Sequence, residues 1–151
     1  MSNKLAFIVF TTVVLYHVEA LLYKDCGSAE GKILKVSADV CPGNTPPCML
    51  PRGQNATITM DFSTSVDVKR ITAVVHGVIA GIPVPFPLSN PDGCKDSGLV
   101  CPVKSGAQDV YKSTIAIKSI YPQIKLVIKW ELKDTDTGKT ITCFVMPAQL
   151  K

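Results

Sequence analysis

Apolar and polar residues alternate along most of the chain. Residues 56–63 place Ala56, Ile58, Met60 and Phe62 on one face and hydroxyl or carboxylate side chains on the other. Residues 124–132 repeat the pattern, and the apolar face there consists of Ile124, Leu126, Ile128, Trp130 and Leu132. This period of two is typical of antiparallel strands that bury one face.

Further strands are predicted over 32–39, 68–79, 110–118 and 139–148, and "DTDTGK" at 134–139 predicts a hairpin turn. No segment has a convincing amphipathic helical period. The chain is therefore predicted to be all-β, an immunoglobulin-like sandwich of two antiparallel sheets. Periodicity does not decide whether the two apolar faces pack together or enclose a cavity, and composition favours a packed core.

A proline-rich apolar stretch, "HGVIAGIPVPFPLSNPDGC" at 76–94, interrupts this pattern. Prolines stand at 83, 85, 87 and 91. Because proline has no N–H to donate to a β-ladder and breaks helices, the stretch is predicted to be neither regular strand nor helix after Gly81.

The first 20 residues have the composition of a secretory signal peptide. Lys4 precedes an apolar run from Leu5 to Val14, and Val18 and Ala20 supply small residues before the predicted cleavage point. The alternative is a membrane anchor, but the run is short for a span, which needs about 20 residues. Residues 21–151 are then a single domain.

Six cysteines, all beyond residue 20, predict three disulfides out of 15 connectivities. Cys41 and Cys48, like Cys94 and Cys101, bracket short turn-rich segments, which leaves Cys26 to pair with Cys143. No CxxC spacing is present and His76 is the only histidine after the leader, so no metal site is expected.

The net charge of +4 is spread over scattered lysines and does not form a nucleic-acid footprint. It is compatible with weak attraction to anionic membranes. With one histidine and six paired cysteines, no catalytic triad or free thiolate is expected, so the chain is predicted not to be an enzyme and to need no cofactor. "NAT" at 55–57 makes Asn55 a predicted glycosylation site.

Several motifs resemble those of a known family. "YKDCGS", "CPGNTPPC", "AVVHGVIAGIPVPFPLSNPDGC", "GLVCPV" and "YPQIKLVIKWEL" are similar to segments of the small soluble Niemann-Pick type C proteins, also called epididymal secretory proteins, of the ML (lipid-recognition) domain superfamily. The resemblance spans nearly all of residues 23–148. It implies an immunoglobulin-like sandwich with a lipid cavity between its sheets, which reverses the preference for a packed core. It also implies the same three disulfides.

The resemblance further implies a set of lipid-binding residues. Positions that match the family's sterol contacts are Phe86, Ile117 and Tyr121, and the expected wall adds Val75, Leu50, Pro122, Ile124, Leu126 and Trp130. Two residues depart from the family pattern: Ala56 stands where vertebrate-like members have tyrosine, and Phe144 replaces a tryptophan. Both are expected to alter the shape of the cavity.

The function implied is that of a secreted carrier, extracellular or in the lysosomal lumen, which binds unesterified sterol and passes it to membranes or a membrane-embedded acceptor. "IPVPFP" is expected to form the mouth, and Ile82, Val84, Phe86, Asp92 and Lys95 to form a membrane or partner loop, assisted by Lys112 or Lys118. The protein is expected to be monomeric. The alternatives are a carrier of fatty acids or other small apolar ligands and a lipid-presenting accessory protein of innate recognition.

Overall fold

The computed structural model describes residues 12–14, 22–41, 43 and 45–151. The predicted signal peptide, 1–20, lies outside the described residues except for 12–14. The described part contains nine strands and no helix, and therefore no helix long and apolar enough to cross a membrane. The prediction of an all-β fold is confirmed.

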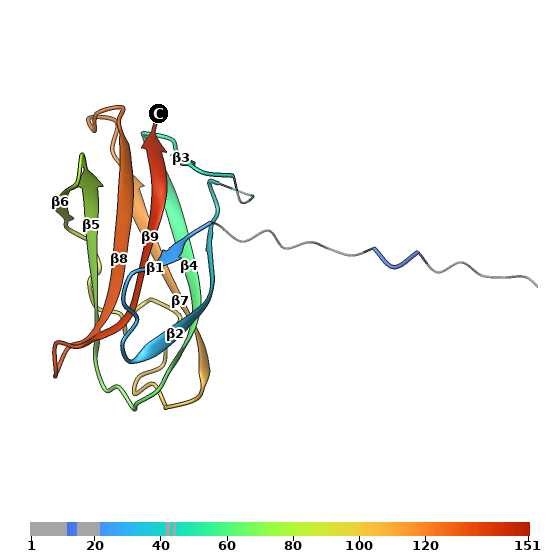
Figure 1. Ribbon diagram of the computed structural model, residues 1–151, viewed down its shortest axis with the longest axis vertical. Coiled ribbons are helices and arrows are strands. Elements are labelled where there is room, and N and C mark those ends of the chain that lie inside the picture. The colour runs from blue at the N-terminus through green and yellow to red at the C-terminus, as the bar shows by residue number, and fades with distance from the viewer. Residues whose placement is uncertain (1–11, 15–21, 42, 44) are drawn as a thin grey trace, which may run out of the picture.

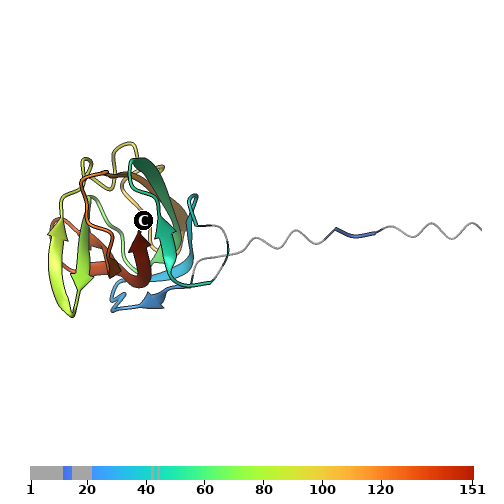
Figure 2. The same cartoon turned by 90° about the horizontal axis from the view of Figure 1, so that it is seen from above.

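The strands form two facing sheets (Figures 1 and 2). The larger has the order β1 (Lys24–Asp25), β9 (Thr140–Leu150), β8 (Lys125–Asp134), β5 (Ile71–Ile79) and β6 (Ile82–Phe86), with β3 (Cys48–Leu50) also paired to β9. The smaller has the order β2 (Gly31–Ala38), β4 (Gln54–Thr64) and β7 (Gln108–Ile117). Neighbouring strands are antiparallel, except that β3 runs parallel to β9.

Alternation along β4 and β8 corresponds to the inner and outer faces of the sheets. Ile58, Met60 and Phe62 of β4 are at most 1% exposed, while the residues between them are partly exposed. Trp130 and Leu132 of β8 are buried equally well. Period two therefore identified the inward faces correctly, because successive side chains of a strand point to opposite sides.

The sequence predicts no regular structure in the proline-rich stretch after Gly81, but the structure has a strand there. Ala80 and Gly81 both have positive φ, of 50° and 80°, which is a two-residue hairpin of the primed type. The chain returns as β6, in which Pro83 pairs with Val78 and Pro85 with His76. The prediction was wrong because β6 is an edge strand. Prolines at alternate positions leave their missing N–H groups on the open edge, so no bond to β5 is lost.

Three disulfides join the cysteines in the predicted pairs. Cys41–Cys48 and Cys94–Cys101 each close a local loop, and Cys26–Cys143 joins the start of the domain to β9. The last pair spans 117 residues of sequence.

The two ends of the sandwich differ in how they are filled. At one end, which we call the mouth end, β5, β7 and β9 finish and β4 and β8 begin; it is the upper end in Figure 1, next to the C-terminus. The opposite half is a packed aromatic core: Trp130 stacks on Phe144 with ring centroids 6.4 Å apart and meets Tyr111 edge-on at 6.2 Å. Burial raises the pKa of the Tyr111 hydroxyl, as expected for a dry interior.

Candidate functional site

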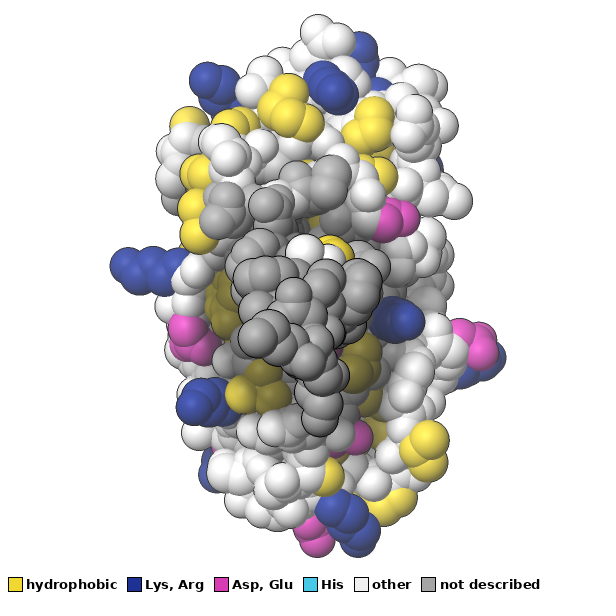
Figure 3. Space-filling view, turned by 90° about the vertical axis from the view of Figure 1, so that its right-hand side faces the viewer, with side chains coloured by type: hydrophobic (Ala, Val, Ile, Leu, Met, Phe, Trp, Pro, Cys, Tyr) yellow, Lys and Arg dark blue, Asp and Glu magenta, His cyan; other side chains and the backbone are white. Residues whose placement is uncertain are grey.

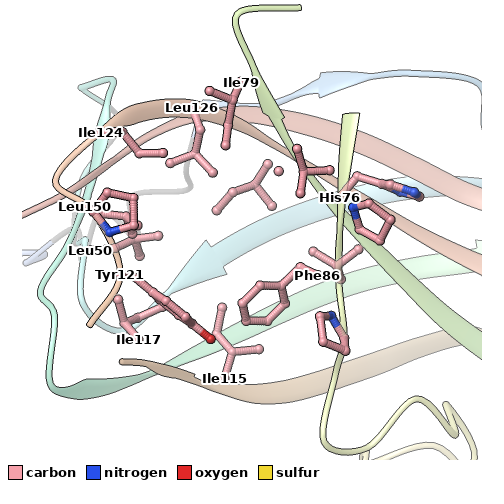
Figure 4. A pocket seen from close by; sticks show the side chains of 17 residues that line it. Leu50, His76, Ile79, Phe86, Ile115, Ile117, Tyr121, Ile124, Leu126 and Leu150 are labelled. Carbon is pink, nitrogen blue, oxygen red and sulfur yellow. The ribbon is translucent and has the colours of Figure 1, made fainter. Parts of the chain in front are cut away.

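A cavity of about 430 Å³ occupies the mouth half of the space between the sheets. Its volume falls in the range of about 300–1,000 Å³ typical of small-molecule sites. It is lined by both sheets and by the segment between β7 and β8, through residues Leu50, Val75, His76, Gly77, Ile79, Val84, Pro85, Phe86, Pro87, Ile115, Ile117, Tyr121, Pro122, Ile124, Leu126, Ile128 and Leu150 (Figure 4). The lining contains no aspartate, glutamate, lysine or arginine, so the cavity suits an apolar ligand.

Two aromatic rings from different elements meet at the wall. Phe86, at the end of β6, and Tyr121, between β7 and β8, are arranged edge-to-face, with ring centroids 6.2 Å apart at 77° (Figure 4). Both side chains are only partly buried, whereas Leu50, Val75 and Ile117 are at most 5% exposed. The pair therefore stands between the interior of the cavity and solvent.

The β5–β6 hairpin provides part of the cavity's width. Val75 pairs with Phe86 and Gly77 with Val84, so these residues share the inward face. A Cβ on Gly77 would lie 3.1 Å from Cδ1 of Leu126, which is tighter than ordinary contact. The absence of a side chain at Gly77 thus leaves space where β5 and β8 approach.

Eight of the nine residues expected to line a lipid site lie on this cavity. They are Leu50, Val75, Phe86, Ile117, Tyr121, Pro122, Ile124 and Leu126. Trp130 does not line it: this side chain is 1% exposed and belongs to the aromatic core beyond the cavity floor. Trp130 is on the same strand face as Leu126 but lies four residues further from the mouth. Alternation predicts the face on which a side chain lies, but not its distance from the end of the sandwich.

The departures from the family pattern also lie off the cavity. Ala56 is fully buried opposite Ile115, and Phe144 belongs to the stack with Trp130. Neither is a lining residue, so the expectation that both reshape the cavity finds no direct contact in support.

Several lining residues were not singled out from the sequence. Ile115, Ile128 and Leu150 are inward residues of β7, β8 and β9 near the mouth end, and Ile79 ends β5. Ile128 is part of the alternating run, so the signal for its inward face was present. The sequence did not show which strand ends lie next to one another at the mouth, so it did not show which inward residues line the cavity.

The five residues expected to form one docking loop are divided between the two ends. Ile82 and Val84 are 66% and 44% exposed at the hairpin, beside Phe86. Asp92 instead bridges to Thr72 at the start of β5, and Lys95 follows it. Since β5 rises about 3.3 Å per residue, some 20 Å separates Thr72 from the hairpin. Lys112, whose N–H donates to the Ser97 carbonyl, also lies away from the mouth.

Apolar and basic residues gather at the mouth end. Ile120, between β7 and β8, is 85% exposed and joins Ile82 and Val84 there. The mouth segments 48–56, 77–86, 115–127 and 147–151 contain four basic residues and no acidic one. Outside residues 1–20 the chain has 15 basic and 11 acidic residues, since Lys4 and Glu19 are removed from totals of 16 and 12. The rest of the domain is thus neutral, and the whole excess of +4 lies at the mouth.

On the face shown in Figure 3, the upper end carries yellow and dark blue side chains and no magenta one, whereas side chains of all three colours lie further down. Asn55, the predicted glycosylation site, is exposed near the start of β4 and pairs with Ala116. The described residues include no group of three or more His, Cys, Asp or Glu side chains that could hold a metal ion.

The sequence of this chain is similar to those of known proteins. The family model of the ML domain matches residues 20–150. The chain is 42% identical to the ecdysteroid-regulated 16 kDa protein of Manduca sexta, over 95% of this chain and 98% of that protein. It is 43% identical to NPC intracellular cholesterol transporter 2 of Danio rerio, over 85% and 83% of the two chains.

A solved structure agrees with the fold. The crystal structure of a Niemann-Pick type C2 protein from the Japanese carpenter ant has a TM-score of 0.82 and 36% sequence identity to this chain, and it covers 86% of this chain and 99% of the ant protein. Because the family model spans nearly the whole domain and relatives above 40% identity extend over most of it, the chain belongs to the ML domain family.

Proposed function

We propose that this protein is a lipid carrier that holds an unesterified sterol in the cavity between its sheets and passes it to membranes or to a membrane-embedded acceptor. The observation that carries the proposal is the 430 Å³ cavity, whose lining is almost entirely hydrocarbon. Burial of a rigid apolar molecule there removes its surface from water without needing many polar contacts.

The relatives support a sterol as the ligand. Proteins of Danio rerio and Mus musculus at 43% and 40% identity are named NPC intracellular cholesterol transporter 2. The chain is a member of a family of lipid-binding carriers and is not an enzyme.

Each part of the site has a role in this proposal. Phe86 and Tyr121 form a gate through which the ligand passes, because they are the partly exposed aromatic pair of the wall. Ile117, Val75, Leu50, Pro122, Ile124 and Leu126 contact the ligand from both sheets and the connecting segment.

Transfer requires the mouth to approach a bilayer. The mouth surface, defined by Ile82, Val84 and Ile120 with Arg52, Lys118, Lys125 and Lys151, offers exposed apolar side chains among positive charges. Anionic lipid headgroups attract such charges, by about 1 kcal/mol for each one near the surface. Pairing of β6 to β5 and its prolines hold Val84 in place, so little conformational entropy is lost on docking.

The remaining proposals concern the secretion, glycosylation and location of the protein. Residues 1–20 would direct secretion, residues 21–151 would be the mature domain, and Asn55 would carry a glycan on the exposed face of β4. The protein would act as a monomer in extracellular fluid or in the lysosomal lumen.

Native mass spectrometry of the protein purified from its source tests the ligand class. A stoichiometric adduct with the mass of a sterol, together with sterol extraction from vesicles, is the expected result. Co-purifying fatty acid and failure to extract sterol would instead favour the fatty-acid carrier. A stable complex with a receptor, without transfer between vesicles, would favour the accessory role.

Acidic substitutions on the mouth surface should slow transfer without weakening binding. In Ile82→Asp and Ile120→Asp, a carboxylate replaces an exposed apolar side chain that does not line the cavity, so docking on anionic vesicles is opposed by both desolvation and charge. We expect at least a tenfold lower rate of sterol transfer between vesicles containing anionic lipid, and an equilibrium affinity within about twofold of wild type.

Val100→Asp is the matched control, because Val100 is 86% exposed inside the Cys94–Cys101 loop, away from the mouth. It carries the same change of charge and should transfer sterol at the wild-type rate. If all three variants slow transfer equally, net charge and not the mouth surface determines the rate.

A further inference from the structure

The segment that carries Tyr121 is held by one side chain from another part of the fold. We call residues 118–124, which join β7 to β8, the gate loop. Arg52, in the turn between β3 and β4, reaches it with one nitrogen: Nη1 donates to the carbonyl oxygen of Ser119 at 3.2 Å and to that of Tyr121 at 2.9 Å. These two carbonyls lie on either side of Ile120.

Few other hydrogen bonds hold the gate loop. Within the described residues, the Tyr121 N–H donates to the Lys118 carbonyl inside the loop, and Ile124 at its end accepts from the N–H of Leu150. Between these points the Arg52 side chain makes the only hydrogen bonds that connect residues 119–123 to another element of the described structure.

Arg52 itself is anchored firmly. Its own N–H donates to the Lys151 carbonyl at 2.9 Å, and the N–H of the next residue, Gly53, donates to the carbonyl of Ile117. The turn is thus tied to the end of β7, at the base of the gate loop. None of the ion pairs of the described residues involves Arg52, so its charge is directed to the two carbonyl dipoles. Hydrogen bonds from a charged donor are stronger than those between neutral groups.

We propose that Arg52 is the latch of the cavity: it holds the gate loop so that the Tyr121 ring closes against Phe86, and its release precedes passage of the ligand. The inference rests on the proposed function in assuming that the ligand passes between these two rings. Arg52 is a positioning residue, because it acts through the backbone of Tyr121 and is not among the residues that line the cavity.

A latch affects rates more than affinity. The bonds to Ser119 and Tyr121 close the gate in the empty and in the filled protein alike, so their loss favours opening in both. Uptake and release should then accelerate together, and the dissociation constant, which is their ratio, should change little. A residue that contacts the ligand would instead alter release and affinity together.

The test compares Arg52→Gln with Arg70→Gln. These are the two arginines of the chain, and Arg70 pairs with Asp136 at the opposite end, so the control has the same change of charge and side chain. Stopped-flow fluorescence with dehydroergosterol measures association, and displacement by excess cholesterol measures release. We expect both rate constants to rise about tenfold in Arg52→Gln, corresponding to about 1.4 kcal/mol, with an affinity within twofold of wild type and Arg70→Gln unchanged.

Amide hydrogen exchange provides a second readout without ligand. In Arg52→Gln, exchange of the Tyr121 amide, which donates to the Lys118 carbonyl inside the loop, should accelerate while β5, β8 and β9 keep wild-type protection. Unchanged exchange in that loop, or unchanged rate constants, would overturn the latch, and so would faster release with a proportional loss of affinity. If the wild-type protein binds no sterol, the proposed function fails, whereas the exchange experiment still decides whether Arg52 holds the loop.

Discussion

Replacing Ile117 by phenylalanine should reduce sterol affinity at least about 100-fold, which corresponds to about 2.7 kcal/mol. Ile117 lies at the end of β7, is 4% exposed and lines the cavity opposite the larger sheet. A phenyl ring at this position extends into the space that the ligand would occupy. Because the ring enters a cavity and not a filled core, the usual cost of overpacking, about 1–3 kcal/mol, should be largely avoided.

Fluorescent sterol titration measures this loss, and circular dichroism with thermal denaturation checks the fold. Ile120→Phe is the matched control: it makes the same change three residues away on a side chain that is 85% exposed and not part of the lining. It should bind sterol as wild type does. Undiminished binding by a folded Ile117→Phe variant would show that the ligand does not occupy this cavity.

Removing the Cys26–Cys143 disulfide should lower the free energy of unfolding more than removing the Cys94–Cys101 disulfide does. The bridge closes a loop with a sequence separation of 117, whereas Cys94 and Cys101 are separated by 7. In the chain-entropy description, a loop of about 100 residues stabilises by about 4.7 kcal/mol and one below 15 residues by less than about 3 kcal/mol. The short β1, which contains only Lys24 and Asp25, should also detach from β9 once Cys26 is free.

Urea unfolding of Cys26→Ser/Cys143→Ser, compared with Cys94→Ser/Cys101→Ser, measures the difference. We expect the first double variant to lose about 2 kcal/mol more than the second. Equal losses would mean that local strain and packing, and not the length of the closed loop, determine the contribution of each bridge.

The agreement between sequence and structure is best where one interaction dominates. Along β4 and β8, burial of one face requires a period of two, so the inward residues could be read from the alternation. The disulfide pairs followed from loop length and elimination. β6 was missed because the prohibition on proline applies to a strand with neighbours on both sides, and its place at the sheet's edge depends on where every other strand lies.

The candidate site shows the same division. The residues that the family resemblance assigned to the lipid are mostly on the cavity, but Trp130 belongs to the packed half, and Asp92 and Lys95 lie away from the hairpin. Arg52 gave no signal at all, because its partners are backbone carbonyls 67 and 69 residues away in sequence.

By itself the sequence determined the all-β class, the inward faces of most strands and the three disulfides, since these depend on local period and spacing. Only the tertiary structure decided that the sandwich is packed at one end and open at the other, and that the excess positive charge gathers at the open end. It also decided that Phe86 and Tyr121 meet there, where Arg52 donates to the Tyr121 carbonyl. The physical reason is that alternation specifies the direction of a side chain but not the distance between two sheets. That distance depends on how strands remote in sequence are aligned along their lengths.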